Sequence, residues 1–244
     1  MKVAVITGAG SGMGAACVKK FRQAGYEVAM IGRRDIPESD GCYYYKCDVS
    51  NYDELKKTTD AIKEKFRHVD VLINNAGVFR GGMIENNTED DYEFIFGINV
   101  KGPFLMMKEL IPVMPEGSAI VNIASSSGQG GDYNATLYGA SKSALIGMTR
   151  CVAVDYAAKG IRVNAISPSA TDCPMFMDGS TPAIINAFKK NIPDHNIGTA
   201  EQIANVAFFL ATDASAHVVG QNIAVDGGLN AWNGQPRQDK EESF

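Results

Sequence analysis

The sequence predicts a single α/β domain built on a doubly wound parallel sheet of seven strands, with helices on both faces. Short apolar runs alternate along the chain with amphipathic stretches of ten or more residues, which is typical of repeated βα units. Most of the short runs are unbroken, as in strands that are buried on both faces. The 244 residues show neither a linker nor an internal repeat, so we expect one domain over residues 1–229.

The individual elements follow from this alternation in chain order. The predicted strands cover residues 3–6, 27–31, 42–46, 69–73, 118–123, 161–166 and 222–225. A first helix is predicted over 12–24, and a long helix starts at Tyr138 and runs to about residue 159. Two more helices begin at capping-box spacings, Thr88 with Asp91 and Thr199 with Gln202.

The last third of the chain contains two irregular segments. Residues 174–198 hold only one amphipathic piece, at 182–191, which predicts a lid over a ligand. Residues 230–244 are polar and lack periodicity, so they are expected to form a tail that frays or docks elsewhere.

The composition excludes several classes of protein. With 45% hydrophobic and 21% charged residues, the chain is expected to be globular rather than disordered. Its 23 basic and 28 acidic residues give a net charge of −5, so we expect a small-molecule partner and neither nucleic acid nor membrane. Five cysteines and three scattered histidines predict reduced thiols and no metal site. The sequence has neither a signal-peptide core nor a run of about 20 apolar residues, so a cytoplasmic location is expected.

A glycine-rich turn follows the first predicted strand and reads Gly8-Ala9-Gly10-Ser11-Gly12-Met13-Gly14. Glycine lets the backbone approach a pyrophosphate, whose charge then meets the free N–H groups at the start of the next helix. The spacing is G-x-x-x-G-x-G rather than G-x-G-x-x-G, so a plain βα turn and the adenosyl site of a methyltransferase are alternatives at this point.

Tyr138 and Lys142 lie four residues apart and therefore on one face of the predicted long helix. We expect the ammonium of Lys142 to lower the pKa of Tyr138 from about 10 toward neutrality, as a general acid/base requires. Ser125 stands thirteen residues before Tyr138, at the end of a predicted strand, where ligands gather in open α/β sheets. An ordinary surface pair would explain the tyrosine and the lysine alone, but the serine and the glycine turn favour a catalytic site.

In these motifs the chain resembles the short-chain dehydrogenase/reductases over about residues 2–228. The TGxxxGxG motif is matched by Thr7, Gly8, Gly12 and Gly14, the NNAG element by residues 74–77, and YxxxK by Tyr138 and Lys142. The resemblance implies a Rossmann-type fold and hydride transfer between a nicotinamide cofactor and a ketone or secondary alcohol. It also implies a catalytic tetrad of Asn99, Ser125, Tyr138 and Lys142. In that tetrad Tyr138 is the general acid/base, and Asn99 kinks the helix that starts at Thr88 and holds a relay water.

The same resemblance implies a set of cofactor contacts, among them Asp48 and Val49 at the adenine and Lys142 at the nicotinamide ribose. The implied contacts are Gly8, Ser11, Gly12, Met13, Gly14, Asp48, Val49, Asn75, Ala76, Gly77, Tyr138 and Lys142. After the sixth strand the family usually has Pro-Gly-x-x-x-Thr, whereas this chain has Pro168, Ser169, Thr171 and Cys173 in that stretch. In the family that threonine hydrogen-bonds the carboxamide group of the nicotinamide. A thiol is a weaker hydrogen-bonding group than a hydroxyl, so we expect the carboxamide to be held differently here or by Thr171.

The end of the second predicted strand favours NADP(H) over NAD(H). In this fold a carboxylate about 20 residues after the glycines binds the ribose 2′-hydroxyl, or an arginine accepts a 2′-phosphate. Here Gly32 takes the acidic position, and Arg33 and Arg34 follow it with two guanidinium groups. Two features keep NAD(H) as the alternative: Asp35 is near enough to reach a ribose, and Ser11 occupies a position that is often basic in NADP-dependent relatives.

The predicted function is therefore that of an oxidoreductase acting on a CH–OH or carbonyl group. The alternative is a non-catalytic NAD(P)-binding sensor or scaffold of the same fold. A hydroxysteroid, a 3-oxoacyl thioester and a polyol all remain candidate substrates, because the segment 174–198 carries apolar side chains while the segment 129–134 carries polar ones. A homotetramer is expected mainly from the resemblance, with the small residues Gly139, Ala140, Ala144 and Gly147 permitting close helix pairing.

Overall fold

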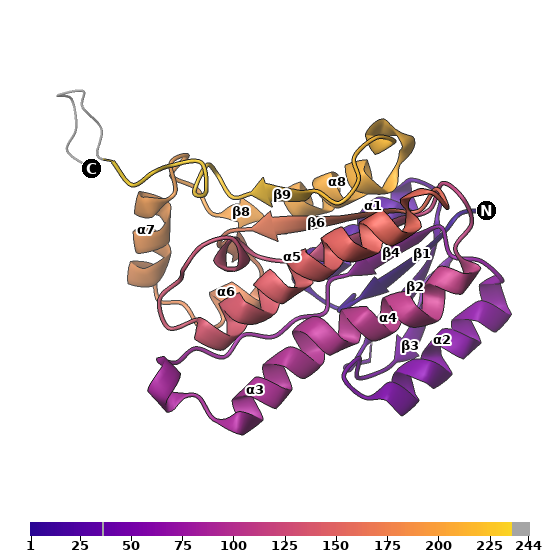
Figure 1. The fold of residues 1–244 in the computed structure, drawn as a ribbon, viewed down its shortest axis with the longest axis horizontal. Helices are drawn as coiled ribbons and strands as arrows, with labels where there is room; N and C mark the ends of the chain where they lie inside the picture. The colour runs from indigo at the N-terminus through magenta and orange to yellow at the C-terminus, as the bar shows by residue number, and fades with distance from the viewer. Residues whose placement is uncertain (36, 236–244) are drawn as a thin grey trace.

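Seven parallel strands form one sheet in the order β3-β2-β1-β4-β5-β6-β9 (Figure 1). The computed structural model describes residues 1–35 and 37–235. The strands are β1 (Val3–Thr7), β2 (Glu27–Gly32), β3 (Cys42–Lys46), β4 (Val71–Asn74), β5 (Ala119–Ile123), β6 (Arg162–Pro168) and β9 (Asn222–Val225). The strand order reverses between β1 and β4, which opens a crevice for ligands at the carboxyl ends of the strands. The predicted seven-stranded, doubly wound sheet is confirmed.

Helices cover both faces of the sheet because successive strand residues point to opposite sides. On one face, Val5 of β1 packs in a cluster with Leu55 of α2 (Tyr52–Phe66) and Leu110 of α4 (Gly102–Leu110). On the other face, the neighbouring Ile6 packs with Phe21 of α1 (Gly12–Gln23) and Leu210 of α8 (Ala200–Ala211). The long helix α5 (Thr136–Ala157) lies on the same face as α4 and runs alongside it in Figure 1.

Three strands, β4, β5 and β6, begin one or two residues later than predicted. For β6, which begins at Arg162 rather than at residue 161, the backbone N–H of Ile161 donates to the carbonyl of Tyr156. The backbone N–H of Val69 donates to the carbonyl of Val113 rather than to a neighbouring strand. Ser118 is used in a turn, where its backbone N–H and its hydroxyl both donate to the carbonyl of Pro115. The predicted strands 69–73 and 118–123 therefore begin at Val71 and Ala119.

A second, two-stranded sheet was not predicted. It pairs β7 (Thr171–Asp172) with β8 (Gly198–Thr199) and joins the two ends of the segment 174–198. Between them lie α6 (Pro174–Met177) and α7 (Pro182–Asn191), the latter with the bounds predicted for the amphipathic piece. The predicted tail is described only up to Gln235, and residues 236–244 lie outside the described residues.

Both predicted capping boxes are present, at Thr88 before α3 (Glu89–Phe96) and at Thr199 before α8. After α3 the chain continues through a π-helical turn, η2 (Gly97–Lys101), into α4. The extra residue in such a turn shifts the helix register, and Asn99, where the resemblance implies a kink, lies within this turn. Among residues 1–35 and 37–235, no helix is long and apolar enough to cross a membrane, and no cluster of His, Cys, Asp and Glu side chains could hold a metal ion.

Candidate active site

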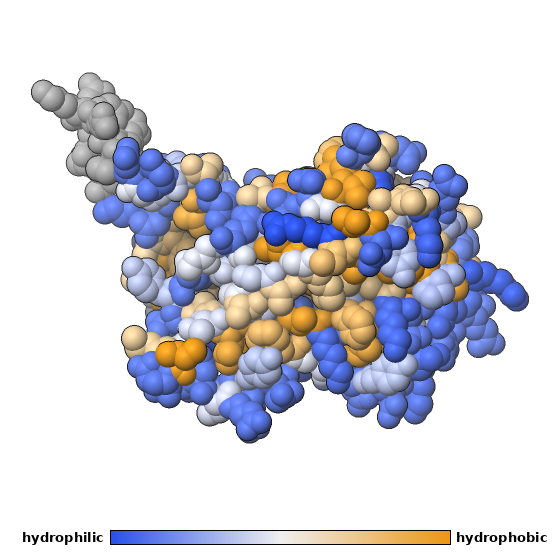
Figure 2. Space-filling view, viewed as in Figure 1, coloured by the Kyte–Doolittle hydropathy of each residue, from blue (hydrophilic) through white to orange (hydrophobic). Residues whose placement is uncertain are grey.

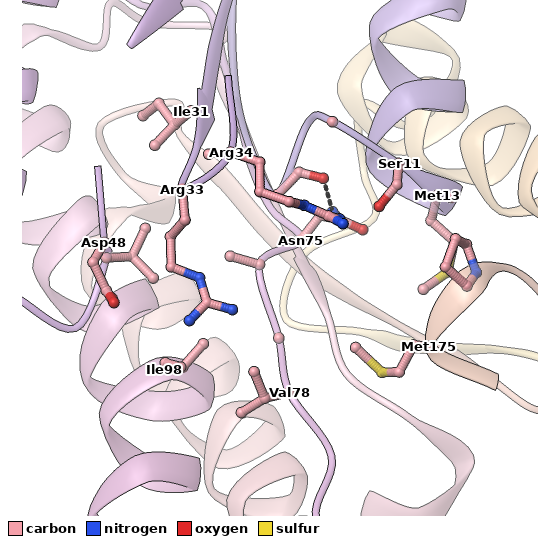
Figure 3. Close-up of a pocket in the computed structure, with 18 of the residues that line it drawn as sticks. Ser11, Met13, Ile31, Arg33, Arg34, Asp48, Asn75, Val78, Ile98 and Met175 are labelled. Carbon is pink, nitrogen blue, oxygen red and sulfur yellow. Dashed lines mark hydrogen bonds between the residues drawn. The ribbon is translucent and has the colours of Figure 1, made fainter. Parts of the chain in front are cut away.

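A cavity of about 600 Å³ lies at the carboxyl ends of β1, β2 and β4, where the strand order reverses (Figure 3). Twelve of the predicted cofactor contacts line it: Gly8, Ser11, Gly12, Met13, Arg33, Arg34, Asp48, Val49, Asn75, Ala76, Gly77 and Cys173. The remaining lining residues are Gly10, Ile31, Gly32, Cys47, Val78, Ile98, Pro174 and Met175. Gly14, Pro168, Ser169 and Thr171 are not among them, and neither are the four residues of the predicted tetrad.

The glycine-rich turn is held tightly against the end of β4. Gly8 and Gly12 have positive φ angles of 64° and 51°, which L residues with side chains rarely adopt. The Thr7 hydroxyl accepts hydrogen bonds from the backbone N–H groups of Asn75 and Ala76, at 3.0 and 2.9 Å. Thr7 thus fixes the turn, a role that its place in the motif did not reveal.

Gly14 supports the turn from behind rather than from inside the cavity. A Cβ atom at this position would lie 2.1 Å from the carbonyl oxygen of Gly8 and 2.6 Å from the side-chain amide nitrogen of Asn75. Only a residue without a side chain lets α1 begin this close to β1.

Replacing Gly14 with Ala should therefore displace the Gly8 turn. We expect a loss of about 1–3 kcal/mol in the free energy of unfolding, as for other overpacked sites, together with weaker cofactor binding. Thermal unfolding and a fluorescence titration with NADPH would measure the two effects. Gly130→Ala is the matched control, because a Cβ there would have no atom within 4 Å; equal behaviour of the two variants would contradict the steric role of Gly14.

Arg33 and Arg34 extend from the turn after β2 into the cavity, and their guanidinium groups point to different parts of it (Figure 3). Arg34 extends toward Ser11 in the glycine turn, whereas Arg33 points between Asp48 and Val78. The Tyr44 hydroxyl lies 3.1 and 2.9 Å from the carbonyl oxygens of Gly32 and Arg34 and so fixes the backbone of this turn.

Asp35, whose carboxylate could have bound the ribose 2′-hydroxyl of NAD(H), does not line this cavity. Its carboxylate pairs instead with Lys46, at 3.2 Å. Both side chains are exposed, so this ion pair is weak, but it directs Asp35 toward β3.

Apolar side chains form the wall behind Asp48 and Val49. Ile31, Val78 and Ile98 lie around this part of the cavity, where a flat ring could be sandwiched (Figure 3). Sequence reasoning missed these residues because an apolar residue at a strand end has the same pattern whether it faces the core or a ligand. The Asp48 carboxylate accepts hydrogen bonds from the backbone and the hydroxyl of Ser50, at 2.9 and 2.7 Å.

The side chain of Asn99 is fully buried, and its polar atoms are all used within the protein. Its Oδ1 accepts the N–H of Val78 at 2.9 Å, and its Nδ2 donates to the carbonyl of Val78 and to the Ser141 hydroxyl, both at 3.0 Å. The amide therefore clamps η2 to the segment that lines the cavity and to α5. Ser141, which sequence reasoning passed over, completes this clamp.

Ser125, Tyr138 and Lys142 lie together beyond the inner end of the cavity. A Cβ on Gly77, which lines the cavity, would be 3.4 Å from the Lys142 Nζ and 3.4 Å from the Asn99 Oδ1. The Lys142 side chain is buried, and its Nζ donates to the carbonyl of Ile123 at 2.8 Å and lies 5.7 Å from the centroid of the Tyr138 ring. Gly128 allows α5 to approach, because a Cβ there would be 2.8 Å from the backbone of Lys142.

The predicted direction of the Tyr138 pKa shift is wrong for this structure. Burial raises the pKa of Tyr138 above its ordinary value of 10.0, and a hydrogen bond with Ser125 only opposes this effect. The Lys142 ammonium does not offset it, because that ammonium is directed to the Ile123 carbonyl and burial lowers the pKa of Lys142 itself from 10.5 to about 8. A protonated phenol is nevertheless the form that can donate a proton.

Cys173 lines the cavity at the position where the resemblance implies threonine. It is mostly buried, and a Cβ on Gly12 would lie 2.9 Å from the Cys173 Cβ. The Thr171 hydroxyl, the expected substitute, donates to the carbonyl of Ser169 at 2.9 Å and lies outside the cavity lining.

These residues fit a dinucleotide. The glycine turn offers close backbone approach and a helix start for a pyrophosphate, the apolar wall suits an adenine ring, and two guanidinium groups reach the space beside them. Beyond Gly77, the Ser125 hydroxyl and the Tyr138 phenol lie where they could give a substrate carbonyl oxygen a hydrogen bond and a proton. This arrangement can perform proton-coupled hydride transfer.

Known proteins resemble this chain over nearly its whole length. The profile of a family described as enoyl-(acyl carrier protein) reductase matches residues 8–230. The meso-2,3-butanediol dehydrogenase of Serratia marcescens is 35% identical, with 97% of each chain covered. A 3-oxoacyl-[acyl-carrier-protein] reductase of Thermotoga maritima is also 35% identical, over 93% of this chain and 97% of that protein. The ligand-free aldohexose dehydrogenase of Thermoplasma acidophilum has a TM-score of 0.91 at 31% identity, over 98% of this chain and 97% of the other.

Two similar solved structures hold nicotinamide cofactors. One is ElxO with NADP bound, at 27% identity and a TM-score of 0.88 over 95% of this chain and 99% of that one. The other is a 3-ketoacyl-(acyl-carrier-protein) reductase from Brucella melitensis complexed with NADH, at 29% identity and a TM-score of 0.86 over 93% and 98%.

Proposed function

Since this chain belongs to the short-chain dehydrogenase/reductase family and is an oxidoreductase that acts on alcohol and ketone groups with a nicotinamide cofactor, we propose that Tyr138 transfers the proton and that the cofactor is NADP(H). The observation that carries the proposal is that the buried Ser125 and Lys142 and the half-buried Tyr138 lie together just beyond Gly77, at the inner end of the cavity. The non-catalytic alternative has no support, because the relatives named above are dehydrogenases and reductases.

In the direction of reduction, the Ser125 hydroxyl would donate a hydrogen bond to the substrate carbonyl oxygen and Tyr138 would give that oxygen its proton. The bound cofactor supplies the hydride to the carbonyl carbon. Lys142 would stabilise negative charge that develops on the phenol, and Asn99 would hold η2 and Val78 in place beside the cofactor. In the direction of alcohol oxidation, Tyr138 would act as the base.

The two arginines support NADP(H) as the cofactor. Arg34 reaches toward Ser11 from the position at which a 2′-phosphate lies in this fold, and Asp35, the nearest competing carboxylate, is directed toward Lys46. Arg33 and Arg34 can each grip a phosphate with paired hydrogen bonds.

Replacing Arg34 with Ala should lower kcat/KM for NADPH by about tenfold or more and leave kcat/KM for NADH within a few-fold, because a charge-assisted pair to phosphate contributes about 1.5–3 kcal/mol. Steady-state kinetics with both cofactors would measure this, with Arg150→Ala as the control because Arg150 is an exposed arginine of α5 outside this cavity. A wild-type preference for NADH, or an unchanged preference in both Arg33→Ala and Arg34→Ala, would count against NADP(H).

We also propose a homotetramer that pairs α4 and α5 between subunits. Figure 2 shows apolar residues along these two helices. Phe104 on α4 and Val154 on α5 are exposed apolar side chains. A Cβ on Gly147 of α5 would have no atom within 4 Å, which leaves room for close approach of another helix.

Light scattering at micromolar concentration should give about four times the mass of one chain, which is 26.2 kDa. Val154→Glu should lower that mass, because it buries a charge in the proposed contact. A monomeric mass for the unaltered protein would overturn the assembly.

A further inference from the structure

We propose that Phe79 determines the substrate specificity of this site, and that the substrate is an uncharged ketone or secondary alcohol with an apolar substituent that packs on the Phe79 ring. This inference rests on the proposed catalytic site and adds its substrate class. Phe79 follows the segment that lines the cavity, and its ring contacts the Tyr138 ring edge to face, with centroids 5.2 Å apart and planes at 78°. The side chain is nevertheless 46% exposed, so one part of the ring covers the phenol and another part is free for a ligand.

The backbone fixes Phe79 on both sides. Before it, Val78 is held through both its N–H and its carbonyl by the Asn99 amide. After it, the N–H of Gly82 donates to the carbonyl of Asn134 at 2.8 Å, and Gly82 pairs with Ala135 immediately before α5. The ring is therefore a preorganised wall rather than a loose surface side chain, and such walls discriminate between substrates.

Gly81 makes room for this ring. A Cβ on Gly81 would lie 3.3 Å from two atoms of the Phe79 ring and 3.3 Å from the carbonyl oxygen of Asn134. The close packing of the ring between Tyr138 and Gly81 leaves few other orientations for it.

The charged groups near Phe79 are already paired within the protein. The guanidinium of Arg80 donates to Asp91 at 2.8 Å and stacks on the Phe94 ring at 3.9 Å. The Asp132 carboxylate accepts a hydrogen bond from the Ser127 hydroxyl at 2.7 Å. The Arg80 guanidinium is therefore already engaged by Asp91 and Phe94 and does not offer an unpaired charge to an anionic substituent.

The lid adds further apolar surface at the same end of the molecule. Met175 of α6 lines the cavity and is 48% exposed, and Phe176 contacts Phe188 of α7 with ring centroids 5.1 Å apart. In Figure 1, α6 and α7 lie at the end where the strands terminate, as does the segment that leads from β4 to α3. Among the substrates left open by the sequence, the apolar classes are therefore favoured over polyols.

Three methyl ketones that differ in one substituent test this inference: benzylacetone with a phenyl group, its analogue with a hydroxyl in that place, and levulinate with a carboxylate. Binding is measured by calorimetry to the whole protein saturated with the oxidised form of the cofactor that the kinetics select, a complex in which no ketone can be reduced. We expect benzylacetone to bind about tenfold or more tightly than either analogue, because apolar pockets discriminate by about this amount. In Phe79→Ala the preference should fall to about threefold or less.

Phe209→Ala is the matched control, since Phe209 is an exposed phenylalanine of α8 away from the cavity, and it should keep the wild-type preference. Equal binding of the three ketones by the unaltered protein, or an undiminished preference in Phe79→Ala, would overturn the role of Phe79. Turnover with the reduced cofactor is measured separately. Absence of turnover alongside an intact, Phe79-dependent binding preference would count against the proposed reaction and uphold this inference.

Discussion

Replacing Tyr138 with Phe should lower turnover by about 10²–10⁴-fold while leaving cofactor affinity within a few-fold. The substitution keeps the ring that packs against Phe79 and removes the hydroxyl, with its transferable proton and its hydrogen bond with Ser125. Turnover would be measured with a ketone that the unaltered protein reduces, and cofactor affinity by fluorescence titration with NADPH. Because reduction needs the protonated phenol, the rate of reduction should also fall at alkaline pH, and the rate of alcohol oxidation should rise there.

Tyr52→Phe provides the matched control for this experiment. Tyr52 lies on α2 outside the cavity lining, and its hydroxyl donates to the carboxylate of Glu109 at 3.3 Å, so the same chemical change there should leave turnover unaltered. Near-normal turnover in Tyr138→Phe would remove Tyr138 from its role as proton donor, whatever the effect on binding.

The fold was predictable because the sheet is covered on both faces. Strands such as β1 and β2 therefore contain continuous apolar runs, at 3–6 and 28–31, that stand out from the amphipathic helices. The pairing of β7 with β8 was not predictable, since two residues on each side carry no periodicity. The late starts of β4 and β5 depend on hydrogen bonds to the distant Val113 and the nearby Pro115, which no local pattern encodes.

The candidate site was predictable where it depends on short motifs, and less so where it depends on packing. Twelve predicted contacts line one cavity, because the segments that follow β1, β2, β3, β4 and β7 meet near the reversal of strand order. Tyr44 was missed, since it acts through a carbonyl contact across the β2–β3 pair. The pKa of Tyr138 was predicted in the wrong direction because it depends on burial and on the hydrogen bond that draws Lys142 to Ile123.

Replacing Lys142 with Met should also lower turnover by about 10²-fold or more, and it should change how stability depends on pH. Burial lowers the pKa of Lys142 from 10.5 to about 8, so the folded protein releases this proton at a lower pH than the unfolded chain does. Below about pH 8 both states carry the proton, and folding bears the full cost of burying the charge. Between about pH 8 and 10.5 only the unfolded chain keeps it, so the free energy of unfolding rises with pH, by about 3 kcal/mol in total from this group.

Methionine has no charge to bury, so Lys142→Met should lack this rise. At neutral pH its stability should be close to that of the unaltered protein, because the avoided burial of a charge is offset by about 1–3 kcal/mol for leaving the Ile123 carbonyl without its donor. Chemical unfolding at several pH values from 7 to 10.5 would measure the difference between the two proteins, which should grow with pH in favour of lysine. Lys57→Met is the control, because Lys57 is exposed on α2 and the same substitution there leaves the buried charge in place. If Lys142→Met gained stability over this range as steeply as the unaltered protein does, Lys142 would not be the buried ammonium that the site requires.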